Sequence, residues 1–165
     1  MTTNQPFNKA TLTFLGVALS IVGLDQLTKA LALRFLEIYE PVPVIPEVLW
    51  FTLAFNDRAA FSLGGANTWV FTLLASIVTL ALLWFGPKFK TKSWLLLGGL
   101  ALGGVSGNLI DRLFRNPGFP NGHVVDFIQI PFNFPIFNIA DIAISSAAFL
   151  IALKVVKGEK FGGSK

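Results

Sequence analysis

Four long hydrophobic segments dominate the pattern of the sequence. Residues 10–24, 59–87 and 93–110 contain no charged side chain, and a fourth segment, 134–153, contains only Asp141. A helix rises about 1.5 Å per residue, so about 20 apolar residues cross the hydrocarbon core of a bilayer. The pattern therefore predicts four membrane helices, near residues 11–33, 68–86, 93–111 and 135–154. The first segment lacks the small-x-small cleavage site of a secretory signal, so we expect it to remain as a mature span.

The two longer connections between these segments favour a small sheet. Residues 41–55 have prolines only at their start and then β-favouring side chains, which predicts short strands with an exposed edge. Residues 116–122 form a turn cluster, and a strand-like stretch over 123–130 follows it. We also expect an interfacial helix over residues 31–39. The predicted fold class is thus an all-α membrane protein with four spans, a small β-cradle and an interfacial helix, all in one integral membrane domain over residues 1–165.

The basic residues predict how this bundle is oriented. With four spans, the N-terminal tail, the connection 86–92 and the C-terminal tail share one side, and they hold eight of the 13 lysines and arginines. Short basic segments stay in the cytoplasm. We therefore expect both termini to be cytoplasmic, with residues 34–67 and 112–134 outside.

Composition excludes several other classes of protein. Hydrophobic residues make up 53% of the chain and charged residues only 13%, which is too little charge to cover a small soluble domain. The absence of cysteine excludes disulfides, thiol nucleophiles and thiolate metal sites, and the single histidine, His123, argues against a histidine metal cluster. We expect no metal and no cofactor. The net charge of +4 follows from the membrane topology, and no basic-aromatic array predicts a nucleic-acid partner.

Polar residues from different predicted spans fall at a similar depth. At helical rise, Asp141 and Asp25 lie about 20 Å from the cytoplasmic face and Asp111 lies about 27 Å from it. Asn108, Asn138 and Asp126 join this level. Because an ionisable residue inside a membrane is costly and is usually functional, the pattern predicts one polar site near the outer surface.

Several of these residues have a structural interpretation. Asp25 and Lys29 are spaced i,i+4 and would pair on one helix face. Asp111 and Arg112 lie at a helix end, where we expect an architectural role, with Arg112 bridging to a neighbouring carboxylate. The glycines in 98–107 favour close helix packing.

Elimination leaves Asp126 and Asp141 as candidates for chemistry. Both have apolar flanking residues and no cation within four positions. Two carboxylates brought together there would share one proton, which is the arrangement that an aspartic protease uses to activate water and polarise a carbonyl. From the spacing alone, a proton relay or a structural role also fits.

Five motifs occur in an order that resembles the bacterial lipoprotein signal peptidases, the type II signal peptidase family. The resemblance covers residues 11–155. The motifs are Asp25-Gln-Leu-Thr-Lys29, Asn56-Asp-Arg-Ala-Ala-Phe61, Gly103-Gly-Val-Ser-Gly-Asn-Leu-Ile-Asp-Arg112, Val124-Val-Asp-Phe127 and Phe137-Asn-Ile-Ala-Asp141.

The resemblance implies an aspartic endopeptidase of the bacterial inner membrane that works without a metal and needs no oligomer. It would cleave prolipoproteins just before a diacylglyceryl-modified cysteine, with membrane lipids around it. The catalytic pair would be Asp126 and Asp141. The supporting or substrate-binding residues would be Asp25, Lys29, Asn56, Asn108, Asp111, Arg112 and Asn138.

One residue departs from the family pattern. Arg58 stands where the family has glycine, a residue that permits close backbone approach. Arginine at this place could instead reach lipid phosphates.

Two other functions compete with this interpretation. One is a proton- or ion-coupled carrier that uses Asp25, Asp111 and Asp141 as a relay, although no span has the mid-membrane Gly/Pro break that carriers favour. The other is a membrane peptidase with Lys29 as the base and a serine nucleophile, which would be Ser62, Ser106 or Ser145.

Overall fold

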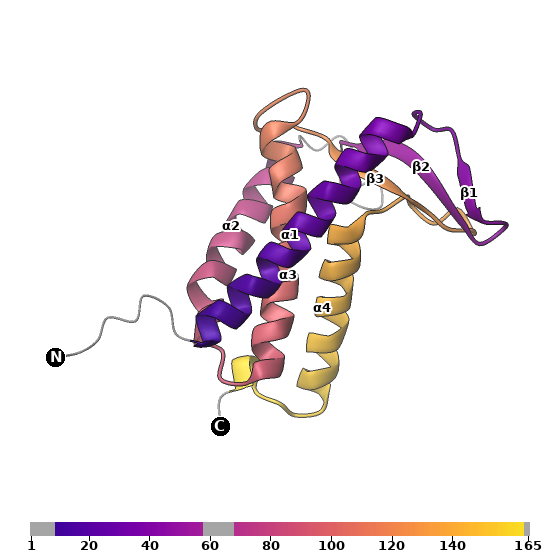
Figure 1. Ribbon diagram of the computed structural model, residues 1–165. Coiled ribbons are helices and arrows are strands. Elements are labelled where there is room, and N and C mark those ends of the chain that lie inside the picture. Colours follow the sequence, from indigo (N-terminus) through magenta and orange to yellow (C-terminus); the bar gives the residue numbers. More distant parts are fainter. Residues whose placement is uncertain (1–8, 58–67, 164–165) are drawn as a thin grey trace.

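Four helices and a three-stranded sheet make up the part of the chain that the structure describes, residues 9–57 and 68–163 of a computed structural model. Figure 1 shows the helices packed side by side, with the sheet at one end of the bundle and the C-terminus at the other. The helices are α1 (Lys9–Phe35), α2 (Trp69–Phe85), α3 (Lys92–Phe114) and α4 (Ile139–Val156). The strands are β1 (Val42–Ile45), β2 (Leu49–Asn56) and β3 (Val124–Gln129), and the short 3-10 turns are η1 (Gly86–Lys88) and η2 (Phe161–Gly163).

All four helices, with α2 counted together with η1, are long and apolar enough to cross a membrane, which confirms the predicted spans. Their ends agree with the prediction to within four residues. The largest difference is at α4, which begins at Ile139 because Asn138 is its N-cap. The Asn138 side chain accepts a hydrogen bond from the backbone N–H of Asp141, and the Asp141 carboxylate accepts one from the backbone N–H of Asn138. This reciprocal cap ends the irregular segment before the helix.

The sheet is antiparallel with the order β1-β2-β3, which confirms the expected strands. Pro43 lies in the edge strand β1, where a residue without an N–H is tolerated. A register shift between Phe51 and Ala54 bends the β2–β3 pair, and beyond it Ala54 pairs with Asp126 and Asn56 pairs with Val124. The pairing therefore brings Asn56 next to Asp126.

The interfacial helix expected over residues 31–39 is not formed, so that expectation is wrong for these residues. Residues 31–35 are the last part of α1. After them, Ile38 forms a bridge with Leu53, and Tyr39 has a positive φ of 61°. A left-handed residue is incompatible with helix continuation, and the bridge joins the chain to the sheet instead.

Helix α3 is the central helix of the bundle. It contacts α1, α2 and α4. In its most apolar stretch 56% of the residues are buried, against 17% or less in the corresponding stretches of the other three spans. Its glycines allow this. A Cβ at Gly103 would lie 2.6 Å from Ile21 Cβ and 2.8 Å from the Ala18 carbonyl on α1, and a Cβ at Gly104 would lie 2.6 Å from the Ala140 carbonyl on α4. The predicted packing role of the glycines is confirmed.

The outer helices carry large apolar side chains on their exposed faces. Leu19 on α1, Leu80 on α2 and Phe149 on α4 are each at least 64% exposed. A soluble protein would cover such surfaces, whereas lipid tails solvate them. The burial pattern therefore fits a bundle that is surrounded by bilayer.

Replacing Gly103 by alanine tests the close approach of α1 and α3. Because the added methyl group overlaps the backbone of α1, Gly103→Ala should destabilise the fold by about 1–3 kcal/mol. The measurement is the apparent melting temperature in detergent. Gly16→Ala is the matched control, since a Cβ there meets no atom within 4 Å. Equal melting temperatures for the two variants would contradict the packing described here.

Candidate active site

A fully buried lysine lies at the centre of the polar residues. The Lys29 ammonium is 2.8 Å from Asp25 Oδ2, 2.8 Å from Asp111 Oδ2 and 2.9 Å from Asn108 Oδ1. The side chains of Lys29, Asp25 and Asp111 are all 0% exposed. A lysine has three N–H donors, so these three partners satisfy it completely. The predicted Asp25–Lys29 pair is formed, and Asp111 on α3 joins it.

The two acids of this cluster extend it to the other elements. Asp25 Oδ1 accepts a hydrogen bond of 3.0 Å from the backbone N–H of Ala140, in the first turn of α4. Negative charge is favourable at a helix N-terminus. Asp111 Oδ2 accepts one of 3.2 Å from the backbone N–H of Val125 on β3. The cluster therefore joins α1, α3, α4 and the sheet.

The sequence analysis did not predict two members of this network, Arg115 and Gln26. Arg115 Nε lies 2.6 Å from Asp111 Oδ1, and Gln26 Nε2 donates to the same oxygen at 3.1 Å. The expectation that Arg112 bridges to a carboxylate is therefore wrong within the described residues. Arg112 donates to the Asn108 carbonyl at 3.4 Å, and Arg115 forms the salt bridge with Asp111 instead. The i,i+4 spacing of Asp111 and Arg115 was the available signal.

Asn138 links the two candidate aspartates. Its side-chain N–H group donates to Asp126 Oδ1 at 2.6 Å, and its backbone N–H donates to Asp141 Oδ2 at 3.1 Å. The same amide group also donates to Asn108 Oδ1 at 3.1 Å. Asn138 is 0% exposed, so these bonds hold it in one orientation.

Each aspartate also has a second asparagine donor. Asn56 Nδ2 donates to Asp126 Oδ2 at 2.9 Å, and Asn108 Nδ2 donates to Asp141 Oδ1 at 2.8 Å. Each of the four carboxylate oxygens therefore accepts one bond and retains capacity for another. The structure brings together all nine site residues that were singled out from the sequence, although they come from α1, β2, α3, β3, α4 and the N-cap residue before α4.

Burial perturbs the protonation of Asp126, which is only 2% exposed. Burial raises the pKa of Asp126 to about 7, and the charge of Asp141 adds to this rise, while hydrogen bonds from Asn56 and Asn138 oppose it. Ionisation of Asp126 therefore costs stability. Its contribution to the free energy of unfolding is complete below the ordinary value of 3.8 and is lost as the pH rises through about 7.

A cavity of about 600 Å³ opens beside these carboxylates. Its lining includes four of the site residues described above, Asn56, Asn108, Arg112 and Asp141. Asp126 does not line it and reaches it through its hydrogen bond to Asn56. The rest of the wall is mostly apolar and includes Phe134, Ile136, Phe137, Ile142 and Ile144. The cavity is therefore an apolar cleft whose polar end contains the carboxylate of Asp141.

Arg58, which departs from the family pattern, and Ser62, a candidate nucleophile, lie outside the residues that the structure describes. Among the residues that the structure describes, no group of three or more His, Asp or Glu side chains could hold a metal ion.

Comparison with known proteins decides the family. The model of the family described as signal peptidase (SPase) II matches residues 17–157. The chain belongs to the signal peptidase II family. It is 42% identical over 149 residues to the lipoprotein signal peptidase of Leifsonia xyli, which covers 90% of this chain and 69% of the relative. It is 40% identical to that of Mycobacterium avium, with 89% and 80% covered.

Solved structures support the same assignment. Two structures of a bacterial membrane enzyme obtained by the in meso method, at 2.3 and 1.9 Å resolution, are both 31% identical to this chain. Their TM-scores are 0.77 and 0.76, with 88% of this chain covered and 88% and 93% of theirs. Membership in the signal peptidase II family makes the protein a multi-pass membrane peptidase, and none of these findings supports a carrier.

The geometry also argues against a Ser/Lys mechanism in this family member. A lysine base must present its nitrogen to the serine hydroxyl, yet Lys29 Nζ is held by two carboxylates at 2.8 Å each. Its three donors are all engaged, so it has no free position for a serine hydroxyl.

Removing the Lys29 ammonium should destabilise the protein strongly. Lys29→Met leaves the buried carboxylates of Asp25 and Asp111 without their shared cation, which should cost about 3–5 kcal/mol. Asp25→Asn should cost less, because Lys29 keeps Asp111. Thermal unfolding in detergent measures both. Leu27→Met is the matched control and should change the stability little, because Leu27 lies on the same helix and is 58% exposed. If Lys29→Met unfolds like Leu27→Met, the cluster does not hold the helices together.

Proposed function

We propose that this protein is an intramembrane aspartic endopeptidase that removes signal peptides from prolipoproteins, with Asp126 and Asp141 as its catalytic pair. The observation that carries the proposal is the pair itself: the buried carboxylate of Asp126 and the half-buried carboxylate of Asp141 are joined through Asn138, and Asp141 lines the polar end of an apolar cleft. Its relatives are named lipoprotein signal peptidases, which supports prolipoproteins as the substrate.

The reaction needs one proton shared between the two carboxylates. The ionised carboxylate takes a proton from water as the water attacks the scissile carbonyl carbon, and the protonated partner donates to the carbonyl oxygen. The tetrahedral intermediate then collapses, the C–N bond breaks, and the new amine takes a proton from the pair. The pKa of about 7 for Asp126 supports a singly protonated pair near neutral pH.

The supporting residues hold the pair in this geometry. Asn56 and Asn108 each donate to one carboxylate, and Asn138 donates to both. Such fixed donors keep the carboxylates oriented before the substrate arrives. The charge of Arg112 interacts with Asp141, Asp111 and Asp126 from the cavity wall, so it offsets the negative charge of the site.

The apolar cleft supports a lipid-modified substrate. A diacylglyceryl chain on the substrate cysteine would lie in the membrane beside Phe134, Ile142 and Ile144, and this would fix the depth of the scissile bond just before the cysteine. All of the site residues come from one chain, so catalysis requires no oligomer.

The location that fits this function is the bacterial inner membrane. We place both termini in the cytoplasm and the active site near the outer leaflet. The lysines of the turn 86–92 and of the C-terminal segment lie at the end of the bundle opposite the sheet, which supports this orientation (Figure 1).

The decisive experiment is cleavage of a diacylglyceryl-modified prolipoprotein by aspartate variants in membranes. Asp126→Asn and Asp141→Asn should each lower the rate by roughly 10³-fold or more, because asparagine cannot exchange the shared proton. Both proteins should still insert. Glu40→Gln, which alters an exposed acid near the sheet, is the control and should retain activity. Near-normal turnover in either aspartate variant would refute the assignment.

The pH profile tests the protonation of the pair. The profile of kcat/KM should be bell-shaped, with an alkaline limb near pH 7 whose apparent pKa belongs to the pair. Asn56→Ala removes a hydrogen bond that stabilises the Asp126 carboxylate, so the pKa should rise and the limb should move to higher pH. A limb that stays in place or moves to lower pH would show that Asn56 does not act through Asp126.

Lipid on the substrate should accelerate cleavage. Each buried methylene contributes about 0.8 kcal/mol, so even two of them predict about a tenfold higher kcat/KM for the diacylglyceryl form than for the unmodified peptide. The two substrates are compared in the same detergent with the same enzyme. Equal kcat/KM values would exclude the lipid from recognition.

A further inference from the structure

A second cavity, of about 390 Å³, lies between α3 and α4 at the end of the bundle opposite the sheet. Leu96 and Leu97 of α3 form one wall, and Leu150 and Leu153 of α4 form the other. Leu96, Leu150 and Leu153 are each about 40% exposed, so the cavity opens to the outside of the bundle. We call it the lower cleft. Its walls are apolar and, in a membrane, its opening faces lipid.

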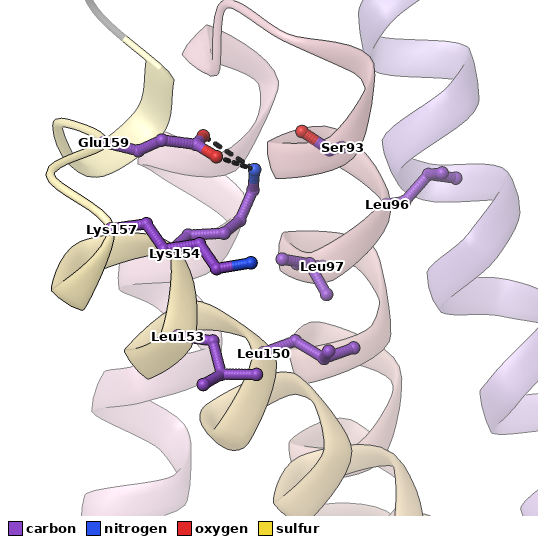
Figure 2. Close-up of a pocket in the computed structure, with 8 residues that line it drawn as sticks. All are labelled: Ser93, Leu96, Leu97, Leu150, Leu153, Lys154, Lys157 and Glu159. Atoms are coloured by element: carbon purple, nitrogen blue, oxygen red, sulfur yellow. Dashed lines mark hydrogen bonds and ion pairs between the residues drawn. The ribbon is translucent and has the colours of Figure 1, made fainter.

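The rim of the lower cleft is charged. Lys154 Nζ lies 2.7 and 2.6 Å from the two carboxylate oxygens of Glu159. Figure 2 shows this pair above Leu97, Leu150 and Leu153. It shows the other ammonium, that of Lys157, pointing between the two helices toward Leu97. Ser93, in the first turn of α3, lies across from them.

The charges of this rim add up to +1. Lys154 and Glu159 balance each other, and the Lys154 hydrogen bond holds the pKa of Glu159 below its ordinary value, so the carboxylate stays charged. Within residues 9–57 and 68–163, Lys157 forms no salt bridge of its own, although its charge also acts on Glu159. The N-terminus of α3 adds partial positive charge beside it, since Thr91 caps that end and Ser93 lies in its first turn.

We propose that the lower cleft binds one anionic phospholipid of the surrounding leaflet. Its phosphodiester would pair with Lys157, and an acyl chain would lie along the four leucines. At helical rise, Leu150 and Lys157 on the α4 side of the cleft are about 10 Å apart along the helix axis, a length that suits the upper part of one acyl chain. Headgroup hydroxyls could donate to Glu159. A single negative charge matches the rim, whereas a choline headgroup would bring its own cation beside Lys157 and the α3 N-terminus.

This site is separate from the catalytic pair. Lys154 lies about 20 Å along α4 from Asp141. The lipid would bridge the far ends of α3 and α4, the two helices whose other ends hold Asn108, Asp111 and Asp141. Occupancy should therefore stabilise the bundle without touching the substrate.

Native mass spectrometry and thermal unfolding of the purified full chain in neutral detergent test the proposal. Phosphatidylglycerol should form a 1:1 adduct and raise the melting temperature more than phosphatidylcholine does. Lys157→Gln should weaken the phosphatidylglycerol adduct about fivefold. Glu159→Gln should strengthen it, because Lys154 loses its competing carboxylate.

Lys88→Gln is the matched control. It removes one charge at the same end of the bundle, but Lys88 lies over the Trp84 ring at 4.3 Å and does not line the lower cleft. Leu97→Phe fills the cleft without changing charge and should also weaken the adduct. Melting temperatures without lipid report whether each variant is folded.

Three results would overturn the proposal. Equal binding of phosphatidylcholine would remove the role of charge. Equal weakening by Lys157→Gln and Lys88→Gln would mean that lysines attract anionic lipid without a site. Unchanged or weaker binding in Glu159→Gln would contradict the charge balance at the rim.

Discussion

The buried ammonium of Lys29 is the group on which the arrangement of this molecule depends. A charge inside a membrane protein is tolerated only when its partners are in place, and removal of one partner leaves the other uncompensated. Lys29 requires Asp25, Asp111 and Asn108 together, which sets the position of α3 against α1. Asp25 then holds the first turn of α4, and Asp111 holds β3. One charge thereby positions four elements.

The asparagines carry this order from the charged cluster to the candidate catalytic pair. Asn108 Oδ1 accepts from Lys29, so its amide N–H group must face the other way, and it donates to Asp141. Asn138 caps α4 with one part of its side chain and donates to Asp126 with the other. Neutral amides are suited to this position, because they orient a carboxylate without supplying a full charge that would hold both aspartates ionised.

The two ends of the bundle meet different surroundings, and their chemistry differs accordingly. At the sheet end, charges are buried and paired, and the apolar cleft opens beside them. At the other end, lysines lie at the surface, where long side chains can reach a headgroup region while their stems stay among leucines. Between the two ends, the exposed faces of α1, α2 and α4 are apolar, as lipid tails require.

Local features of the sequence were sufficient to predict the spans, the strands and the close approach at the glycines. Each depends on neighbouring residues: the length of an apolar run, prolines placed before β-favouring residues, or a missing Cβ. Six of the polar site residues were also chosen from their predicted depth, namely Asp25, Asn108, Asp111, Asp126, Asn138 and Asp141, whereas Asn56 came only from the family resemblance. The choice of Asp126 and Asp141 among the acids came from their apolar neighbours and from the family resemblance, and their catalytic role stays a proposal.

Only the tertiary structure decided which polar group meets which. Asp25 and Ala140 are 115 positions apart and Lys29 and Asn108 are 79 apart, and no local pattern links them. Arg115 rather than Arg112 forms the salt bridge with Asp111, and Gln26 donates a hydrogen bond to the same carboxylate. The rotation of α3 and α1 against each other selects which of these side chains face one another. A separate interfacial helix was expected over residues 31–39, but residues 31–35 continue α1, and the bridge between Ile38 and Leu53 joins the following residues to the sheet. A hydrogen bond or ion pair depends on distances of a few tenths of an ångström, and packing sets those distances.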